Sequence, residues 1–218
     1  MKLYHLTSAH FGVIALALRR LKVSRLSELN DPFELAAVEA ETPTHEEYFR
    51  RLKAKIDATH GVLCFSQEWR NPLLWGHYAD RLRGVALGFE VTSTHLVPVL
   101  YENSPIKVET DPANGLPVLS GDAVDRLQRL KFKDWSYEQE MRVYVKLDPT
   151  TEEGGLFFYP FDAQLVLTEV VLGPRCDLPI AELQHLLDSL VSPVTVTRSR
   201  LDPRTFSVVP EHPHSASA

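Results

Sequence analysis

Two spacings of hydrophobic residues along the chain distinguish its expected strands from its expected helices. Short apolar or alternating runs predict strands at residues 2–6, 21–24, 61–66, 85–91, 141–147, 156–158, 169–172 and 194–198. Apolar residues that recur every third or fourth position predict helices at residues 9–20, 44–60, 72–83, 122–133 and 179–190. The polar, proline-containing stretch at residues 104–117 is expected to be an irregular loop.

The order of these elements predicts an α+β fold. Strands and helices do not alternate regularly enough for a doubly wound parallel sheet, so a compact single domain with mostly antiparallel strands is favoured. The chain has 218 residues, of which 44% are hydrophobic, as in ordinary globular domains. We expect one domain over residues 1–210 and a disordered Pro/Ser/Ala-rich tail over residues 211–218.

The charge and the cysteines narrow the class of protein. The chain carries 23 Lys and Arg against 29 Asp and Glu, a formal net charge of −6, which argues against general binding to nucleic-acid phosphates. No apolar stretch approaches the roughly 18 residues of a membrane span, and the N-terminus lacks the apolar core of a signal peptide. We therefore expect a cytoplasmic protein without a membrane partner. Cys64 and Cys176 form no metal-binding pair and are expected to be buried free thiols.

Two polar segments near the N-terminus are candidates for a site. In a strand, His5 and Thr7 share one face, so His5 can point into a cleft; the alternative is a half-exposed histidine on an edge strand. Asn30, Asp31 and Glu34 surround a rigid Asn-Asp-Pro turn. Such oxygen-rich loops can bind sugar hydroxyls or a hard cation, but the same residues also build turns that have no other role.

A third segment combines aromatic rings with a histidine. Ser66 ends an apolar strand, and the next expected helix carries Trp75, His77 and Tyr78. Trp75 and Tyr78 are three residues apart and share a helix face, which suits stacking on a flat ring with a polar group at its rim. The alternative is that both rings belong to the core and that His77 is satisfied within the fold.

The strongest catalytic signal lies at the start of the strand near residue 140. If this strand begins near Glu138, the side chains of Glu138, Glu140 and Arg142 project to one face. Apolar and aromatic neighbours on both sides indicate partial burial, where Arg142 would keep one carboxylate ionised and oriented. A purely structural ion pair is the competing interpretation.

Taken together and in order, these motifs resemble a widespread bacterial family of unknown function, over about residues 3 to 209. The motifs are Tyr4-His5-Leu6-Thr7, Asn30-Asp31-Pro32-Phe33-Glu34, Cys64-Phe65-Ser66, Trp75-Gly76-His77-Tyr78-Ala79, Gly84 with Gly88-Phe89, Trp135-Ser136-Tyr137-Glu138-Gln139-Glu140-Met141-Arg142 and Val170-Val171-Leu172-Gly173-Pro174. That family resemblance implies no activity by itself.

More loosely, the chain resembles the ADP-ribosyltransferase superfamily, which orders a first-strand His, a central Ser or aromatic residue and a late Glu in this way. The resemblance implies an ADP-ribosyltransferase-like core with NAD as substrate. Glu140 would be the catalytic residue, with Glu138 as its substitute. The implied NAD-binding residues are His5, Thr7, Asn30, Ser66, Trp75, His77, Tyr78 and Arg142. His5 would bind a ribose or the adenosine, Ser66 would support the site, and Tyr78 or Trp75 would stack on the nicotinamide.

The resulting hypothesis is an ADP-ribosyltransferase or NAD glycohydrolase that cleaves the nicotinamide–ribose bond, in the setting of a bacterial toxin or phage-defence effector. Its acceptor is left open between nucleic acid, protein, a small molecule and water. Two alternatives remain. One is a metal-dependent nucleotide or nucleic-acid hydrolase that uses Asp31, Glu34, His77 and Glu140 as ligands. The other is a non-catalytic binding or sensor module in phage defence.

Overall fold

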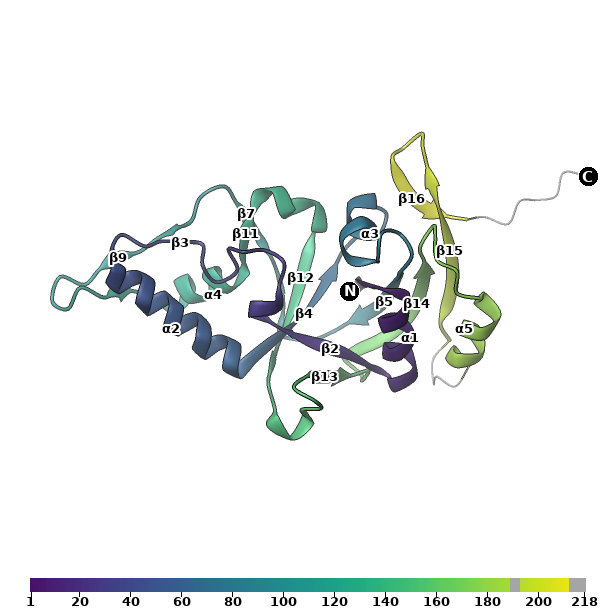
Figure 1. Cartoon of the computed structure of the whole chain (residues 1–218), viewed down its shortest axis with the longest axis horizontal. Helices are drawn as coiled ribbons and strands as arrows, with labels where there is room; N and C mark the ends of the chain where they lie inside the picture. The colour runs from purple at the N-terminus through teal and green to yellow at the C-terminus, as the bar shows by residue number, and fades with distance from the viewer. Residues whose placement is uncertain (189–192, 212–218) are drawn as a thin grey trace, which may run out of the picture.

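Ten strands within the described residues form one large sheet (Figure 1). The structure is a computed structural model that describes residues 1–188 and 193–211. The sheet consists of β1 (Lys2–Thr7), β2 (Arg20–Arg25), β4 (His60–Ser66), β5 (Val85–Val91), β6 (Leu96–Pro98), β12 (Glu140–Lys146), β13 (Phe157–Pro160), β14 (Leu165–Leu172), β15 (Thr195–Asp202) and β16 (Ser207–Pro210).

The pairing within this sheet is antiparallel apart from the parallel pair β14–β15. The main path runs β13-β2-β4-β1-β5-β14-β15-β16, and β12 pairs along the other side of β4 and also carries β6. The chain is thus a mixed α+β single domain with a large, mostly antiparallel sheet, as predicted. Residues 212–218, expected to be a disordered tail, lie outside the described residues.

The remaining elements are short strands and helices around this sheet. The short strands are β3 (Val38–Glu39), β7 (Leu100–Glu102), β8 (Ile106–Lys107), β9 (Glu109–Thr110), β10 (Pro117–Val118) and β11 (Leu130–Phe132). The helices are α1 (Ala9–Leu18), α2 (Pro43–Thr59), α3 (Pro72–Tyr78), α4 (Gly121–Arg129) and α5 (Ile180–Leu187), with 3-10 turns η1 (Leu26–Glu28), η2 (Lys133–Glu138) and η3 (Pro149–Thr151). All five predicted helices are present. The predicted loop over residues 104–117 contains β8, β9 and the first residue of β10.

Local capping hydrogen bonds begin three of the helices, and a turn with positive φ angles ends α3. Side chains of Ser8, Thr42 and Ser120 accept backbone N–H groups in the first turns of α1, α2 and α4. The helix expected over residues 72–83 stops at Tyr78, because the following residues 80–82 have positive φ. This turn brings Gly84 so close to β1 that a Cβ atom there would lie 2.1 Å from the Thr7 carbonyl oxygen.

The two faces of the sheet bury different clusters. Leu63 and Phe65 of β4 point into a core with α1 and α5, whereas Val62 points to the opposite face. That opposite face carries two clusters: one with α2 and α4, the other built around Trp75 of α3. Figure 1 shows α2 and α4 on one side of the molecule, and α5 with the β15–β16 hairpin on the other.

Gly88 in β5 illustrates how closely the strands approach on this second face. A Cβ atom at Gly88 would lie 3.1 Å from both the Tyr4 ring and the Glu169 Cβ atom. A glycine inside a strand marks close approach of a ligand or a neighbour, and here the neighbours are side chains of β1 and β14.

Among the residues described, no helix combines the length and the apolarity needed to cross a membrane.

Candidate functional site

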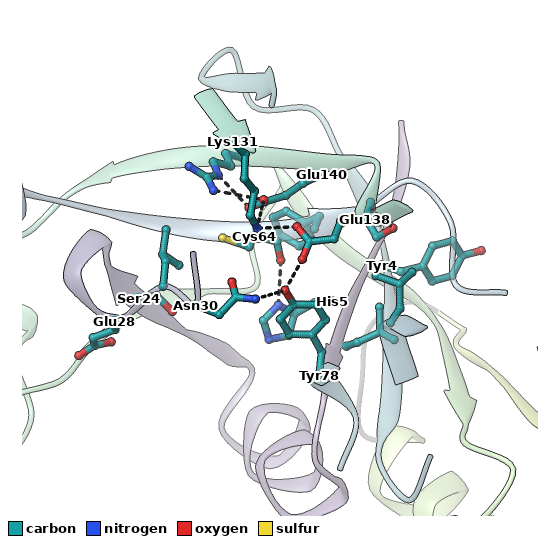
Figure 2. Close-up of a pocket in the computed structure, with 16 residues that line it drawn as sticks. Tyr4, His5, Ser24, Glu28, Asn30, Cys64, Tyr78, Lys131, Glu138 and Glu140 are labelled. Atoms are coloured by element: carbon teal, nitrogen blue, oxygen red, sulfur yellow. Dashed lines mark hydrogen bonds and ion pairs between the residues drawn. The ribbon is translucent and has the colours of Figure 1, made fainter. Parts of the chain in front are cut away.

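A cavity of about 240 Å3 opens where β1, β4 and β12 meet α3 and the η1 loop. Its walls combine residues of these three strands with polar side chains from β2, the η1 loop, α3, β11 and η2. The lining residues are Tyr4, His5, Leu6, Ser24, Glu28, Leu29, Asn30, Cys64, Phe65, Ser66, Leu74, Tyr78, Lys131, Glu138, Glu140 and Arg142. Figure 2 shows this group in close-up.

The floor of the cavity is a buried ion-pair network around Arg142. The Arg142 side chain is fully buried and forms an ion pair with Glu34, with Nη1 donating to Oε2 at 3.0 Å and Nη2 donating to Oε1. Its Nε also donates to Glu140 Oε1 at 2.8 Å. Arg142 therefore orients Glu140, as predicted, but it also binds Glu34 from the Asn-Asp-Pro loop.

Lys131 connects this floor to a second carboxylate. Its ammonium lies 2.5 Å from Glu138 Oε2 and 3.2 Å from Glu140 Oε2 (Figure 2). The other oxygen of Glu138 accepts the hydroxyl of Tyr78, whose oxygen in turn accepts the Asn30 amide at 2.6 Å. Glu138 thus faces one cation and one neutral donor, whereas both oxygens of Glu140 face cations.

The backbone near these carboxylates explains how they come to lie side by side. Glu138 ends the 3-10 turn η2, and Glu140 begins β12. Between them Gln139 takes a left-handed conformation with φ of 43°, so the strand begins at Glu140 rather than near Glu138. Ser66 donates its hydroxyl to the Glu138 carbonyl at 2.5 Å, and the Tyr101 hydroxyl accepts the Glu140 N–H at 2.8 Å.

The two carboxylates have opposite electrostatic environments. Burial opposes ionisation of Glu140, but the charges of Arg142 and Lys131 outweigh it and lower the pKa of Glu140 to about 2. Burial raises the pKa of Glu138, although Lys131 and Tyr78 favour its charged form. Burial also raises the pKa of Tyr78, and the adjacent Glu138 charge adds to this, so the phenol stays a hydrogen-bond donor.

His5 contributes a neutral imidazole to the cavity wall. Its Nδ1 lies 3.0 Å from the Cys64 carbonyl oxygen, a contact in which the ring nitrogen donates. Burial lowers the pKa of His5, against the weaker effect of this hydrogen bond. Its Nε2 is therefore an acceptor, suited to a hydroxyl of a bound ligand.

The structure brings His5, Asn30, Ser66, Tyr78, Glu138, Glu140 and Arg142 into the same cavity. It does not bring Thr7, Trp75 or His77 there. Trp75 is fully buried and its Nε1 donates to the Trp69 carbonyl at 2.5 Å, so its predicted stacking on a ligand is wrong. Thr7 lies at the far end of β1 beside Gly84, and His77 is exposed outside the cavity.

The carboxylates considered for a metal site already have other hydrogen-bond partners within the fold. Arg142 occupies both Glu34 oxygens, and Arg142 together with Lys131 occupies those of Glu140. Asp31 accepts the Phe33 N–H at 2.9 Å and so shapes its own turn. Over residues 1–188 and 193–211, no three His, Cys, Asp or Glu side chains are grouped so that they can hold a metal ion.

Three polar residues of the site were not predicted from the sequence. Lys131 was expected within a helix, but α4 ends at Arg129 and β11 turns the Lys131 side chain into the network. Ser24 and Glu28 reach the cavity from β2 and η1. A lysine between two apolar neighbours, Leu130 and Phe132, is a weak signal of burial that only the ion pairs make interpretable.

Comparisons of the chain with protein-family models, with curated proteins and with solved structures give no match. The two resemblances read from its motifs therefore remain predictions, and a function is inferred from the geometry of the cavity.

Proposed function

We propose that the protein cleaves the nicotinamide–ribose bond of NAD, as an ADP-ribosyltransferase or NAD glycohydrolase. The observation that carries this proposal is the convergence of Glu138, Tyr78 and neutral His5 on one cavity. Bond cleavage leaves an electron-poor, oxocarbenium-like ribose carbon, which a fixed carboxylate stabilises. The bonding electrons leave with the nicotinamide nitrogen, and an oxygen of water or of another acceptor attacks the ribose and loses a proton.

Within this proposal Glu138 is the catalytic carboxylate and Glu140 a positioning residue, which reverses the order expected from sequence. One oxygen of Glu138 accepts a hydrogen bond from the neutral Tyr78 hydroxyl, and a ribose hydroxyl can replace that donor. The raised pKa of Glu138 also suits it to receive the proton from the attacking oxygen. Glu140 holds Lys131 and Arg142 in place through its own ion pairs.

The size of the cavity limits how much of NAD it takes. Its volume of about 240 Å3 is smaller than the about 300–1,000 Å3 of pockets that enclose drug-sized ligands. We assign the nicotinamide and its ribose to the cavity, with the ring against half-buried Tyr78 and a ribose hydroxyl donating to His5 Nε2. The remaining half of the dinucleotide lies outside.

Replacing Glu138 with glutamine is expected to lower the rate of nicotinamide release by roughly 100- to 1,000-fold, because the amide keeps the shape but loses the stabilising charge. Purified wild-type and variant proteins are incubated with NAD, and free nicotinamide is followed by chromatography. The matched control is Glu152→Gln, which neutralises an exposed glutamate outside the cavity and should leave the rate unchanged. Equal rates for Glu138→Gln and wild type would contradict the assignment of Glu138.

The substitution Tyr78→Phe tests the hydrogen bond to the catalytic carboxylate. The Tyr78 hydroxyl favours the charged form of Glu138, so its removal raises the pKa of Glu138 further. If activity needs the ionised carboxylate, the acid limb of the pH–rate profile shifts upward by roughly half a unit to one unit. Tyr159→Phe, which removes a hydroxyl bound to Asp162 outside the cavity, is the control and leaves the limb in place. A Tyr78→Phe profile that overlays that of wild type would count against this role of Tyr78.

A second candidate is a non-catalytic binding module for a small polar ligand. The observation that favours it is that each oxygen of Glu138 and Glu140 already has a partner within the fold. In that case NAD or a related ligand raises the melting temperature while no nicotinamide is released from wild type, and Glu138→Gln has no effect on biological activity. The proposal of NAD cleavage also includes an ADP-ribose acceptor and a role as a toxin or phage-defence effector. Both are to be identified by assays once nicotinamide release has been measured.

A further inference from the structure

Three aromatic rings form a cluster at the outer edge of the cavity. We call His77, Trp135 and Tyr137 the rim cluster. Their ring centroids are 6.1 Å apart for His77 and Trp135, 6.0 Å for His77 and Tyr137, and 6.1 Å for Trp135 and Tyr137. His77 comes from α3 and the other two from η2, so two separate segments converge to build it.

The rim cluster adjoins the cavity at three points. The Tyr78 ring, which lines the cavity, lies 6.2 Å from the His77 ring. Lys131, the cation that binds Glu138, places its ammonium 4.9 Å from the Trp135 ring centroid. Tyr137 directly precedes Glu138 in the chain. A molecule that fills the cavity and extends outward can therefore reach the cluster.

The burial of the rim cluster differs from that of a packing cluster. His77 is exposed and Trp135 and Tyr137 are half-buried, whereas Trp69 and Trp75, the two other tryptophans, lie in the core. Within the described residues, the Tyr137 hydroxyl has no hydrogen-bond partner although it is shielded from solvent. Buried hydroxyls normally have a partner, and an aromatic surface with an unused polar group fits a flat, polar heterocycle.

We propose that the rim cluster is a stacking subsite for a nucleobase and that its occupant is the adenine end of NAD. This inference rests on the proposed function, because the cavity takes only the nicotinamide half and the adenine half must lie outside it. Stacking on an aromatic side chain is open to any nucleobase, because every base has a flat π-face, and it stabilises binding substantially. The net charge of −6 disfavours a nucleic-acid strand as the occupant.

The test uses two halves of NAD. AMP carries the adenine but no nicotinamide, and nicotinamide mononucleotide carries the nicotinamide but no adenine. Binding of each to the full chain is measured by isothermal calorimetry and by tryptophan fluorescence. Trp135→Ala is expected to weaken AMP and NAD binding by roughly 5- to 150-fold and to leave binding of nicotinamide mononucleotide unchanged. Trp135→Phe should restore most of the AMP affinity, because it restores an aromatic face.

The control is Phe11→Ala, which removes an exposed aromatic ring from α1, outside the cavity and the rim cluster, and should not alter AMP binding. Absence of AMP binding to wild type, or AMP binding that Trp135→Ala leaves intact, would overturn the subsite. Oligonucleotide binding that Trp135→Ala abolishes while NAD binding persists would overturn adenine as the occupant and point to an acceptor base. AMP binding without any nicotinamide release would support the subsite while rejecting NAD cleavage, so the two proposals can fail separately.

Discussion

Replacing Arg142 with methionine is expected to lower the free energy of unfolding by about 3–5 kcal/mol, the range seen when one partner of a buried ion pair is removed. Arg142 is fully buried and its partners Glu34 and Glu140 expose 1% and 6% of their side chains. Methionine fills a similar volume but leaves both carboxylates without their main cation. Lys131 remains near Glu140, whereas Glu34 loses the only ion pair that it forms within the described residues. Urea denaturation followed by circular dichroism measures the change.

The matched control is Arg126→Met, which breaks an ion pair with Glu102 in which both side chains are partly exposed. Solvent already screens this pair, so a change within about 1 kcal/mol is expected. Adding Glu34→Gln to Arg142→Met should recover part of the lost stability, because it neutralises one of the two stranded charges. Arg142→Met that unfolds at the same urea concentration as Arg126→Met would show that the buried network does not hold the site together.

The parts of the fold that sequence could predict are those set by local chemistry. The N-cap oxygens of Ser8 and Ser120 begin helices in the structure near the positions that periodicity gives. The strand over residues 85–91 has the predicted bounds, because it pairs with β1 and β14 and its apolar side chains are buried on both faces of the sheet. Whether a segment forms a helix or a strand is thus set by patterns among residues that are close together in the sequence.

The parts that sequence missed depend on contacts between distant residues. Arg142 meets Glu34, which is 108 positions away, and nothing in either segment specifies that pairing. Trp75 has the residue type and spacing of a stacking platform, yet it packs against Trp69 in the core with ring centroids 6.3 Å apart. Tyr78, three residues later on the same helix, lines the cavity instead. A helix face alone could not distinguish the two rings.

The same network makes a prediction about acid stability that concerns Glu140. Its folded-state pKa is about 2, against an ordinary value of 4.5. A lowered pKa contributes stability above the unfolded-state value, and that stability is lost as the pH falls toward 2. Between pH 5 and pH 3 the ionised Glu140 should therefore account for a loss of about 2 kcal/mol in the free energy of unfolding. Glu34 and Glu138 have raised pKa values, so they bind protons in the folded state and act in the opposite direction.

Glu140→Gln should consequently be less stable than wild type at neutral pH and should lose less stability between pH 5 and pH 3. Urea denaturation at pH 3, 4, 5 and 7 gives both curves, with Glu152→Gln, at an exposed glutamate outside the cavity, as the control that keeps the wild-type slope. Parallel curves for Glu140→Gln and wild type would mean that Glu140 is not held ionised by Arg142 and Lys131. A weaker dependence of the free energy of unfolding on pH in the variant would show that Glu140 stays ionised in the folded wild-type protein. Glu138, whose pKa shifts the other way, would then be the carboxylate that can exchange a proton in the proposed cleavage of NAD.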